Sequence, residues 1–178
     1  MFKIAKQFDF CYGHSVWKQM LDADLSCNSA CKCKHQHGHQ GTIIIYLEGD
    51  ELDDRGMFLD FNELTWFKKW LDDTLDHKMI IDYSDPARQI FYPASKDIID
   101  LNYDESGYFY IRPEVYRDLS FREKEIYEGL VIVPFVPTSE NLSKWIWEIV
   151  NKRIGHLCKV SQIQFFETPK SQSNFYAK

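Results

Sequence analysis

The sequence lacks the features of several broad protein classes. Its first ten residues, MFKIAKQFDF, contain no apolar run of signal-peptide length, and no stretch approaches the roughly 20 apolar residues of a membrane-spanning helix. Internal repeats and low-complexity segments are absent as well. We therefore expect a cytoplasmic protein that does not insert into a membrane.

An excess of positive charge is also missing. The net charge is -6, whereas proteins that bind nucleic acids usually carry a basic face. A small anionic substrate stays possible, because the local potential in a cleft matters more than the total charge. With 178 residues, 44% of them hydrophobic and 16% aromatic, the chain is long enough for one domain, residues 1–178, with a sizeable core.

Strand and helix patterns do not alternate regularly along the chain, which favours an α+β fold with antiparallel pairing over a doubly wound sheet. Apolar residues at helical spacing predict two strong helices, at 61–75 and 138–154, with Asp60 as a cap of the first. Strand patterns cover residues 2–17, 40–52, 56–61, 130–135 and 158–168. A short strand at 107–112, a short helix at 120–129 and a tail at 169–178 complete the prediction.

What the sequence does have is a dense cluster of soft metal ligands. Four of the five cysteines precede residue 34, and the stretch CKCKHQHGHQG, residues 31–41, leads directly into a strand pattern. In a reducing compartment such clustering indicates a metal site or catalysis more than disulfides.

The histidines of this cluster suggest a metal site. Residues two apart in a strand point to the same face, so His37 and His39 can offer two imidazoles to one ion, with His14 as the third ligand. Three histidines and an open position are typical of catalytic Zn²⁺. Two alternatives remain: a polar loop, or a structural zinc site of Cys27, Cys31, Cys33 and one histidine, whose spacings fit zinc fingers poorly.

Other side chains are candidates for proton transfer or binding. Cys31 and Cys33 lie close enough to the histidines for a metal cation to activate a thiol, whereas we expect Cys11 and Cys158 to be inert buried thiols. Asp76 and His77 could move a proton together, or could be an exposed pair at a helix end. Glu167, if it points into a cleft, could accept two N–H donors from a heterocycle; otherwise it is solvated.

The order of these features resembles the 6-pyruvoyl-tetrahydropterin synthase and 6-carboxytetrahydropterin synthase family. The resemblance is carried by FCYGHS, CKHQHGHQGTIIIYLEG, GMFLDFNEL, LDHKMI, PTSENLSKWIWE and FFET, in this order. It implies the tunnelling fold, which is a four-stranded antiparallel sheet with two helices on one face. Subunits of this fold assemble into a homo-oligomeric barrel, with active sites between subunits.

The resemblance also implies roles for individual residues. His14, His37 and His39 match the zinc ligands, and Asp76 and His77 match the catalytic pair. The catalytic thiol matches Cys33 in the carboxy branch and Cys31 in the pyruvoyl branch; the motifs are closer to the carboxy branch, which favours Cys33. Substrate binding is assigned to Glu167, as the pterin anchor, and to Thr138 and Glu140 in PTSEN.

The implied reaction is that of a zinc-dependent carbon-carbon lyase. It converts 7,8-dihydroneopterin triphosphate to 6-carboxy-5,6,7,8-tetrahydropterin, acetaldehyde and triphosphate, on the route to queuosine. The alternatives are a pyruvoyl synthase or related pterin-triphosphate enzyme, and a non-catalytic zinc-stabilised interaction module. The segment from about 86 to 129 is longer than in the family, and its many aromatic residues predict that it is ordered.

Overall fold

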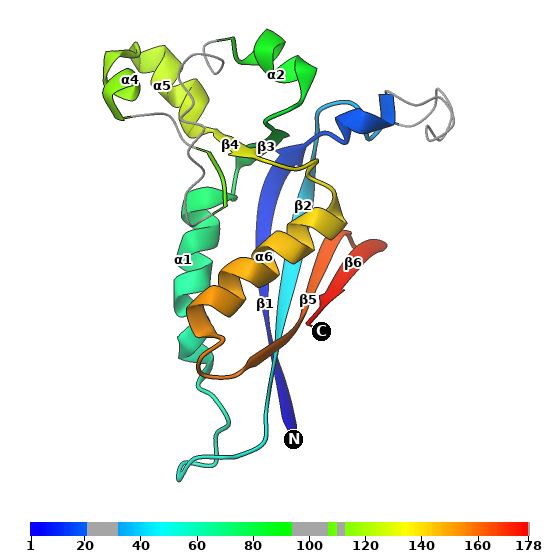
Figure 1. Ribbon diagram of the computed structural model, residues 1–178, viewed down its shortest axis with the longest axis vertical. Coiled ribbons are helices and arrows are strands. Elements are labelled where there is room, and N and C mark those ends of the chain that lie inside the picture. Colours follow the sequence, from blue (N-terminus) through cyan, green and yellow to red (C-terminus); the bar gives the residue numbers. More distant parts are fainter. Residues whose placement is uncertain (21–31, 94–106, 110–112, 178) are drawn as a thin grey trace. The chain divides into compact units, whose positions relative to one another are not determined.

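The computed structural model describes residues 1–20, 32–93, 107–109 and 113–177. Its six strands form one sheet in the order β4-β3-β1-β2-β5-β6 (Figure 1). The strands are β1 Phe2–His14, β2 His37–Gly49, β3 Lys78–Asp82, β4 Leu130–Val133, β5 Lys159–Thr168 and β6 Ser171–Tyr176. The α-helices are α1 Thr65–Thr74, α2 Pro86–Phe91, α4 Pro113–Asp118, α5 Phe121–Glu128 and α6 Ser139–Ile154, and short 3-10 helices span Trp17–Met20 and Phe61–Leu64.

The sheet corrects the expected four-stranded antiparallel one. β2 pairs antiparallel with β5, and β5 with β6, but β3 runs parallel to both β1 and β4. The two additional parallel strands are only five and four residues long. The expected strand at 130–135 corresponds to β4, but β3, a short run directly after a helix pattern, carries little periodicity. The α+β class could therefore be predicted, but the mixed sheet could not.

Two other expectations about strands are wrong. Residues 56–61 do not form a strand, because the chain turns there: the Met57 carbonyl accepts the Asp53 N–H at 2.9 Å, and Gly56 has a φ of 75°. The expected tail at 169–178 contains β6, which pairs with β5 from Gln162↔Tyr176 to Thr168↔Ser171. Pairing with a neighbouring strand, and not hydrophobic alternation, makes this polar segment a strand.

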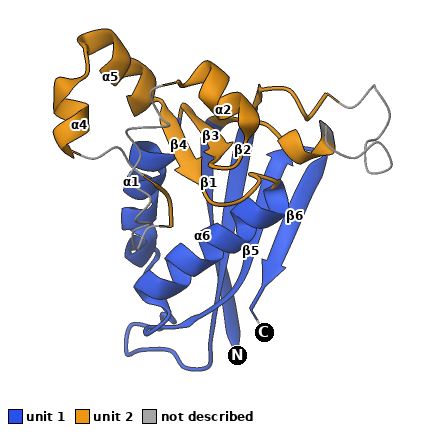
Figure 2. Cartoon of the chain, turned by 45° about the horizontal axis from the view of Figure 1, so that its top comes forward, with its two compact units in different colours: residues 1–11, 39–76, 139–178 blue, residues 12–38, 77–138 orange. Residues whose placement is uncertain are grey.

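The chain divides into two compact units, shown in Figure 2. Unit 1 contains residues 1–11, 39–76 and 139–178, and unit 2 contains residues 12–38 and 77–138.

In unit 1, helices α1 and α6 pack on the sheet through aromatic side chains. Phe67 of α1 meets Phe8 of β1 with ring centroids 5.0 Å apart, and Trp70 meets Trp145 of α6 at 5.7 Å. Helix α6 packs along β5 and β6 (Figure 1). Both strong helices are therefore confirmed, and the expected cap is present, since the Asn62 N–H donates to Asp60 Oδ1 at 2.8 Å.

In unit 2, the described parts of the segment 86–129 pack against β3 and β4. Ile81, Tyr127 and Ile132 form a buried cluster, and among the side chains packed on it are Tyr92, Phe109, Val115 and Leu119. Helix α5 starts with a capping box of Ser120 and Glu123. These parts of the segment therefore pack on a core cluster, while residues 94–106 and 110–112 lie outside the described residues, and the order of the whole segment stays a prediction.

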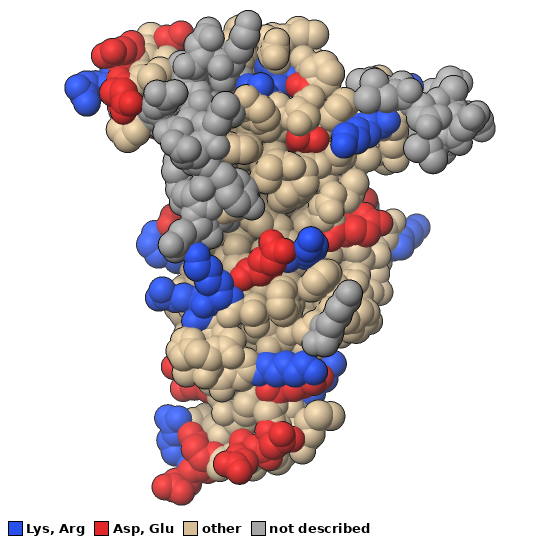
Figure 3. Space-filling view, viewed as in Figure 1, with Lys and Arg blue, Asp and Glu red and all other residues tan. Residues whose placement is uncertain are grey.

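Charges on the face drawn in Figure 3 are interleaved, with blue and red side chains side by side. Helix α6 also has an ion pair one helical turn apart, between Lys144 and Glu148 at 3.8 Å. Among the described residues, no helix is long and apolar enough to cross a membrane.

Candidate active site

His14 and His37 form the centre of the candidate site. His14 ends β1 with its side chain fully buried, and half-buried His37 begins β2. Their Nε2 atoms are 3.1 Å apart. Each ring also hydrogen-bonds a backbone carbonyl through Nδ1, His14 to Pro137 at 2.6 Å and His37 to His35 at 2.7 Å.

These hydrogen bonds determine which ring nitrogens are protonated. A carbonyl oxygen only accepts, so both Nδ1 atoms carry the proton, and in neutral imidazoles both Nε2 atoms then expose lone pairs. Two lone pairs that face each other at 3.1 Å repel, unless one ring is protonated or a cation binds both nitrogens. Metal-binding histidines typically donate the other N–H to a carbonyl or carboxylate, as here. The donor set therefore fits a metal ion.

His39 completes the group. The ligand atoms of His14, His37 and His39 all lie within 4.8 Å of one another. Strand alternation accounts for His37 and His39. Gly38, between His37 and His39, passes close to β1, since an added Cβ would lie 3.2 Å from the Tyr12 carbonyl oxygen. Glu167, near the end of β5, places a carboxylate oxygen 3.7 Å from Nε2 of His39, so it lies beside this histidine and not in open solvent.

The pair Asp76 and His77 connects α1 to β3. His77 has a φ of 59°, a left-handed conformation that is uncommon for a side chain with a Cβ and often marks functional positions. The Asp76 carboxylate accepts the backbone N–H of Cys11 at 2.8 Å. The Cys11 thiol, the Asp76 carboxylate and a His77 ring nitrogen lie within 4.8 Å of one another.

This arrangement corrects the expectation that Cys11 is buried and inert. Cys11 is exposed, and its thiol lies beside the Asp-His pair. Cys158 is half-buried, and burial raises its pKa, as expected of an unreactive thiol.

Cys33 is also exposed, and it lies four residues before His37. Its carbonyl accepts the backbone N–H of Val16 at 2.8 Å, which ties the cysteine segment to the chain just after His14. The alternative thiol Cys31, and Cys27 of the alternative zinc site, lie outside the described residues.

The comparison with protein families is decisive at this point. The family described as 6-pyruvoyl tetrahydropterin synthase matches residues 3–178. The chain belongs to this family.

Individual proteins are similar to this chain over nearly its whole length. The 6-carboxy-5,6,7,8-tetrahydropterin synthase of Aquifex aeolicus is 28% identical over 185 residues, covering 97% of this chain and 96% of that protein. A solved structure of an uncharacterized protein from Wolinella succinogenes is 44% identical, covers 99% and 98% of the two chains, and has a TM-score of 0.88. The 6-pyruvoyl tetrahydropterin synthase of Caenorhabditis elegans shares the fold alone, with a TM-score of 0.60, 18% identity, and 99% and 96% coverage. Membership supports an enzymatic function.

Two elements of the site carry no signal in the sequence. One is the Pro137 carbonyl, which holds His14 and directly precedes Thr138. The other is Cys11 beside Asp76, 65 residues apart in the chain. Thr138 itself is half-buried, and Glu140 is exposed in the first turn of α6. Their role in substrate binding stays a prediction.

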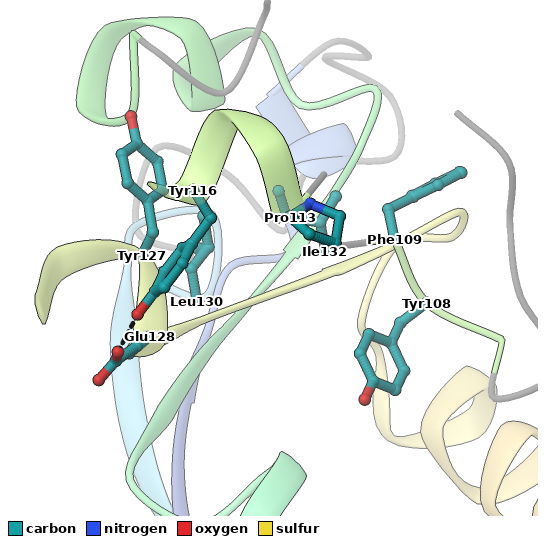
Figure 4. Close-up of a pocket in the computed structure, with 8 residues that line it drawn as sticks. All are labelled: Tyr108, Phe109, Pro113, Tyr116, Tyr127, Glu128, Leu130 and Ile132. Atoms are coloured by element: carbon teal, nitrogen blue, oxygen red, sulfur yellow. Dashed lines mark hydrogen bonds between the residues drawn. The ribbon is translucent and has the colours of Figure 1, made fainter. Parts of the chain in front are cut away.

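A separate cavity of about 380 Å³ lies within unit 2. Figure 4 shows Tyr116 pointing toward Glu128, to which its hydroxyl donates a hydrogen bond. This bond to a carboxylate raises the pKa of Tyr116. The cavity is lined by Tyr108, Phe109, Pro113, Tyr116, Tyr127, Glu128, Leu130 and Ile132, so it belongs to the segment 86–129 and its neighbouring strand.

Proposed function

We propose that the protein is a zinc-dependent lyase that converts 7,8-dihydroneopterin triphosphate and water to 6-carboxy-5,6,7,8-tetrahydropterin, with release of acetaldehyde and triphosphate, in queuosine biosynthesis. The observation that carries the proposal is the pair of Nε2 atoms of His14 and His37, 3.1 Å apart, with both Nδ1 atoms bound to carbonyls. Family membership and the similarity to the Aquifex aeolicus synthase support this choice of reaction.

His14, His37 and His39 would hold the zinc ion. When bound, zinc supplies Lewis acidity toward the hydroxyl oxygens of the substrate side chain. The carbonyls of Pro137 and His35 keep the rings of His14 and His37 in the tautomer that binds a metal.

Glu167 would bind the pyrimidine edge of the pterin. A carboxylate has two acceptor oxygens, which match adjacent N–H donors of a guanidine-like ring. The Glu167 carboxylate lies 3.7 Å from Nε2 of His39, which would keep it next to the metal. The side chain of a pterin bound to Glu167 would then reach the metal. Thr138 and Glu140 would provide further polar contacts.

Cys33 and His77 would move protons on the substrate side chain, with Asp76 orienting His77. Each positioned acid or base contributes on the order of 10²–10⁴-fold in rate. We propose that the protein is a homo-oligomer in which Cys33 and the Asp-His pair of one site come from different subunits. Closing several sheets into a barrel would also cover their exposed edges.

Product analysis tests the proposed function. The zinc-loaded protein is incubated with 7,8-dihydroneopterin triphosphate, and the products are identified by chromatography and mass spectrometry. Acetaldehyde with 6-carboxytetrahydropterin supports the proposal. A 6-pyruvoyl product would instead indicate the pyruvoyl branch, and no turnover in a fully zinc-loaded sample would favour a non-catalytic module stabilised by zinc.

A further inference from the structure

Two buried carboxylates lie at the end of β3 and just after it in unit 2. Asp82 is 3% exposed and Asp85 is 2% exposed. Burial of a carboxylate is costly unless hydrogen bonds satisfy its oxygens, so their partners show what the charges hold in place.

Each carboxylate uses its two oxygens in the same way. One oxygen accepts a backbone N–H of its own turn, from Ser84 to Asp82 Oδ1 and from Ala87 to Asp85 Oδ1, both at 2.8 Å. The other oxygen accepts a side-chain donor from the chain after His14: Trp17 Nε1–H donates to Asp82 at 2.8 Å. Likewise, Ser15 Oγ–H donates to Asp85 at 3.2 Å.

The held segment, residues 15–17, connects two candidate functional residues. It follows His14 directly, and its central residue, Val16, donates its backbone N–H to the Cys33 carbonyl at 2.8 Å. Ser15 and Trp17 flank Val16, so the two carboxylates fix the segment on both sides of this bond. All of these residues belong to unit 2.

Arg88 makes further contacts within the turn that carries the carboxylates. Arg88, 3% exposed, donates Nε–H to the Tyr83 carbonyl at 2.9 Å, and its guanidinium lies 4.5 Å from the centre of the Tyr83 ring. Arg88 brings a positive charge into the chain segment that contains both carboxylates. A turn held in this way is a fixed support for residues 15–17.

The same residues border a cavity of about 290 Å³ in unit 2. Ser15, Trp17 and Asp85 line it together with Lys34 and His35, which lie directly after Cys33. A shift of the held segment would therefore change both this cavity and the placement of Cys33.

We propose that Asp82 and Asp85 are positioning residues that act through Trp17 and Ser15. They fix the position of His14, which directly precedes the held segment. They also fix the position of Cys33, whose carbonyl accepts the Val16 N–H. The roles of His14 as a zinc ligand and of Cys33 as the catalytic thiol rest on the proposed function. The placement itself does not, because metal affinity and thiol reactivity report on it without turnover.

The main test replaces Trp17 with Phe, which keeps a six-membered aromatic ring but lacks the pyrrole part of the indole, and with it the N–H that Asp82 accepts. We measure the zinc dissociation constant by chelator competition, the alkylation rate of Cys33 by iodoacetamide with peptide mass spectrometry, and kcat and KM separately. Loss of a residue that orients a metal ligand typically weakens metal binding or activity about 10- to 100-fold. We expect an increase in the zinc dissociation constant of about tenfold and an altered Cys33 alkylation rate.

Trp147→Phe is the matched control. Trp147 is in unit 1, and its indole N–H donates to the Val160 carbonyl at 2.8 Å, so this variant loses a hydrogen bond from the same donor and of the same length, to a neutral carbonyl in place of a carboxylate. It should leave zinc affinity and Cys33 alkylation at the wild-type values, even if its melting temperature falls.

Ser15 provides a second pair of variants that needs no aromatic change. Ser15→Ala should weaken zinc binding and change Cys33 alkylation in the same direction as Trp17→Phe, whereas Ser15→Thr keeps the hydroxyl and should restore both. If Trp17→Phe and Ser15→Ala both behave like Trp147→Phe, the inference is wrong and the bonds are ordinary structural ones. If these effects appear in a protein that does not turn over the pterin substrate, the positioning role stands and the proposed function fails.

Discussion

Replacing His37 with Ala should abolish the stabilisation of the protein by zinc. A ligand that binds only the folded state adds RT ln(1 + [L]/Kd), which is about 2.7 kcal/mol at a free concentration of 100 times Kd. For a chain of 178 residues, each kcal/mol raises the melting temperature by about 2–4 °C. Wild-type protein at that zinc concentration should therefore melt about 5–11 °C higher than with a chelator. His37→Ala leaves only two of the three histidines, and its shift should fall close to zero.

The melting temperature of the same variant in the presence of a chelator provides a second test. The Nε2 atoms of His14 and His37 are 3.1 Å apart, a contact that is unfavourable between two neutral rings when no cation binds both, and replacing His37 removes it. The melting temperature of His37→Ala with chelator should thus be equal to or above that of the wild type.

Differential scanning calorimetry in buffered zinc and in chelator measures both effects. His156→Ala is the control, because His156 is an exposed histidine of unit 1 outside the histidine group, and it should keep the full zinc shift. The reasoning is refuted if His37→Ala also keeps the full shift while a combined Cys27, Cys31 and Cys33 variant loses it.

Three further predictions concern the thiols and the assembly. Cys33→Ala should abolish turnover while zinc content and fold persist, and Cys31→Ala should have a mild effect; the reverse order in activity assays would indicate the pyruvoyl branch. Mixing inactive Cys33→Ala with inactive His77→Ala subunits should restore part of the activity, and light scattering should show a homo-oligomer. A fully active monomer would contradict sites shared between subunits. Burial raises the pKa of Cys158, so its alkylation should rise with pH at a higher midpoint than that of free cysteine. Peptide mass spectrometry follows this alkylation. A midpoint equal to that of free cysteine would show that the thiol is open to solvent.

The alternation of side chains along a strand was enough to predict the part of the site that lies on one strand. His37 and His39 are two residues apart, and strand alternation alone places both near one point. Helix α1 and its preceding 3-10 turn were predictable for the same reason, because apolar residues at helical spacing and the Asp60 cap are local signals.

The remaining features depend on contacts between distant parts of the chain. The Pro137 carbonyl orients His14 across 123 residues, and Asp76 binds the Cys11 backbone across 65. Strands β3 and β6 are short or polar, and form through pairing with a neighbouring strand. A local residue pattern does not determine which distant group a carbonyl or a strand edge will bind. These hydrogen bonds and strands could therefore be seen only in the structure.

X-ray absorption spectroscopy at the zinc edge tests the central claim most directly, that ring nitrogens of His14, His37 and His39 bind the metal and leave a position open. Zinc bound to imidazole has Zn–N distances of about 2.0–2.1 Å, and zinc bound to thiolate has Zn–S distances of about 2.3 Å. The account predicts three imidazole ligands and one light-atom ligand, with no sulfur in the first shell. A sulfur ligand in the fully loaded protein would place the metal on a cysteine, at the cysteine cluster or beside Cys11, and would contradict the assignment.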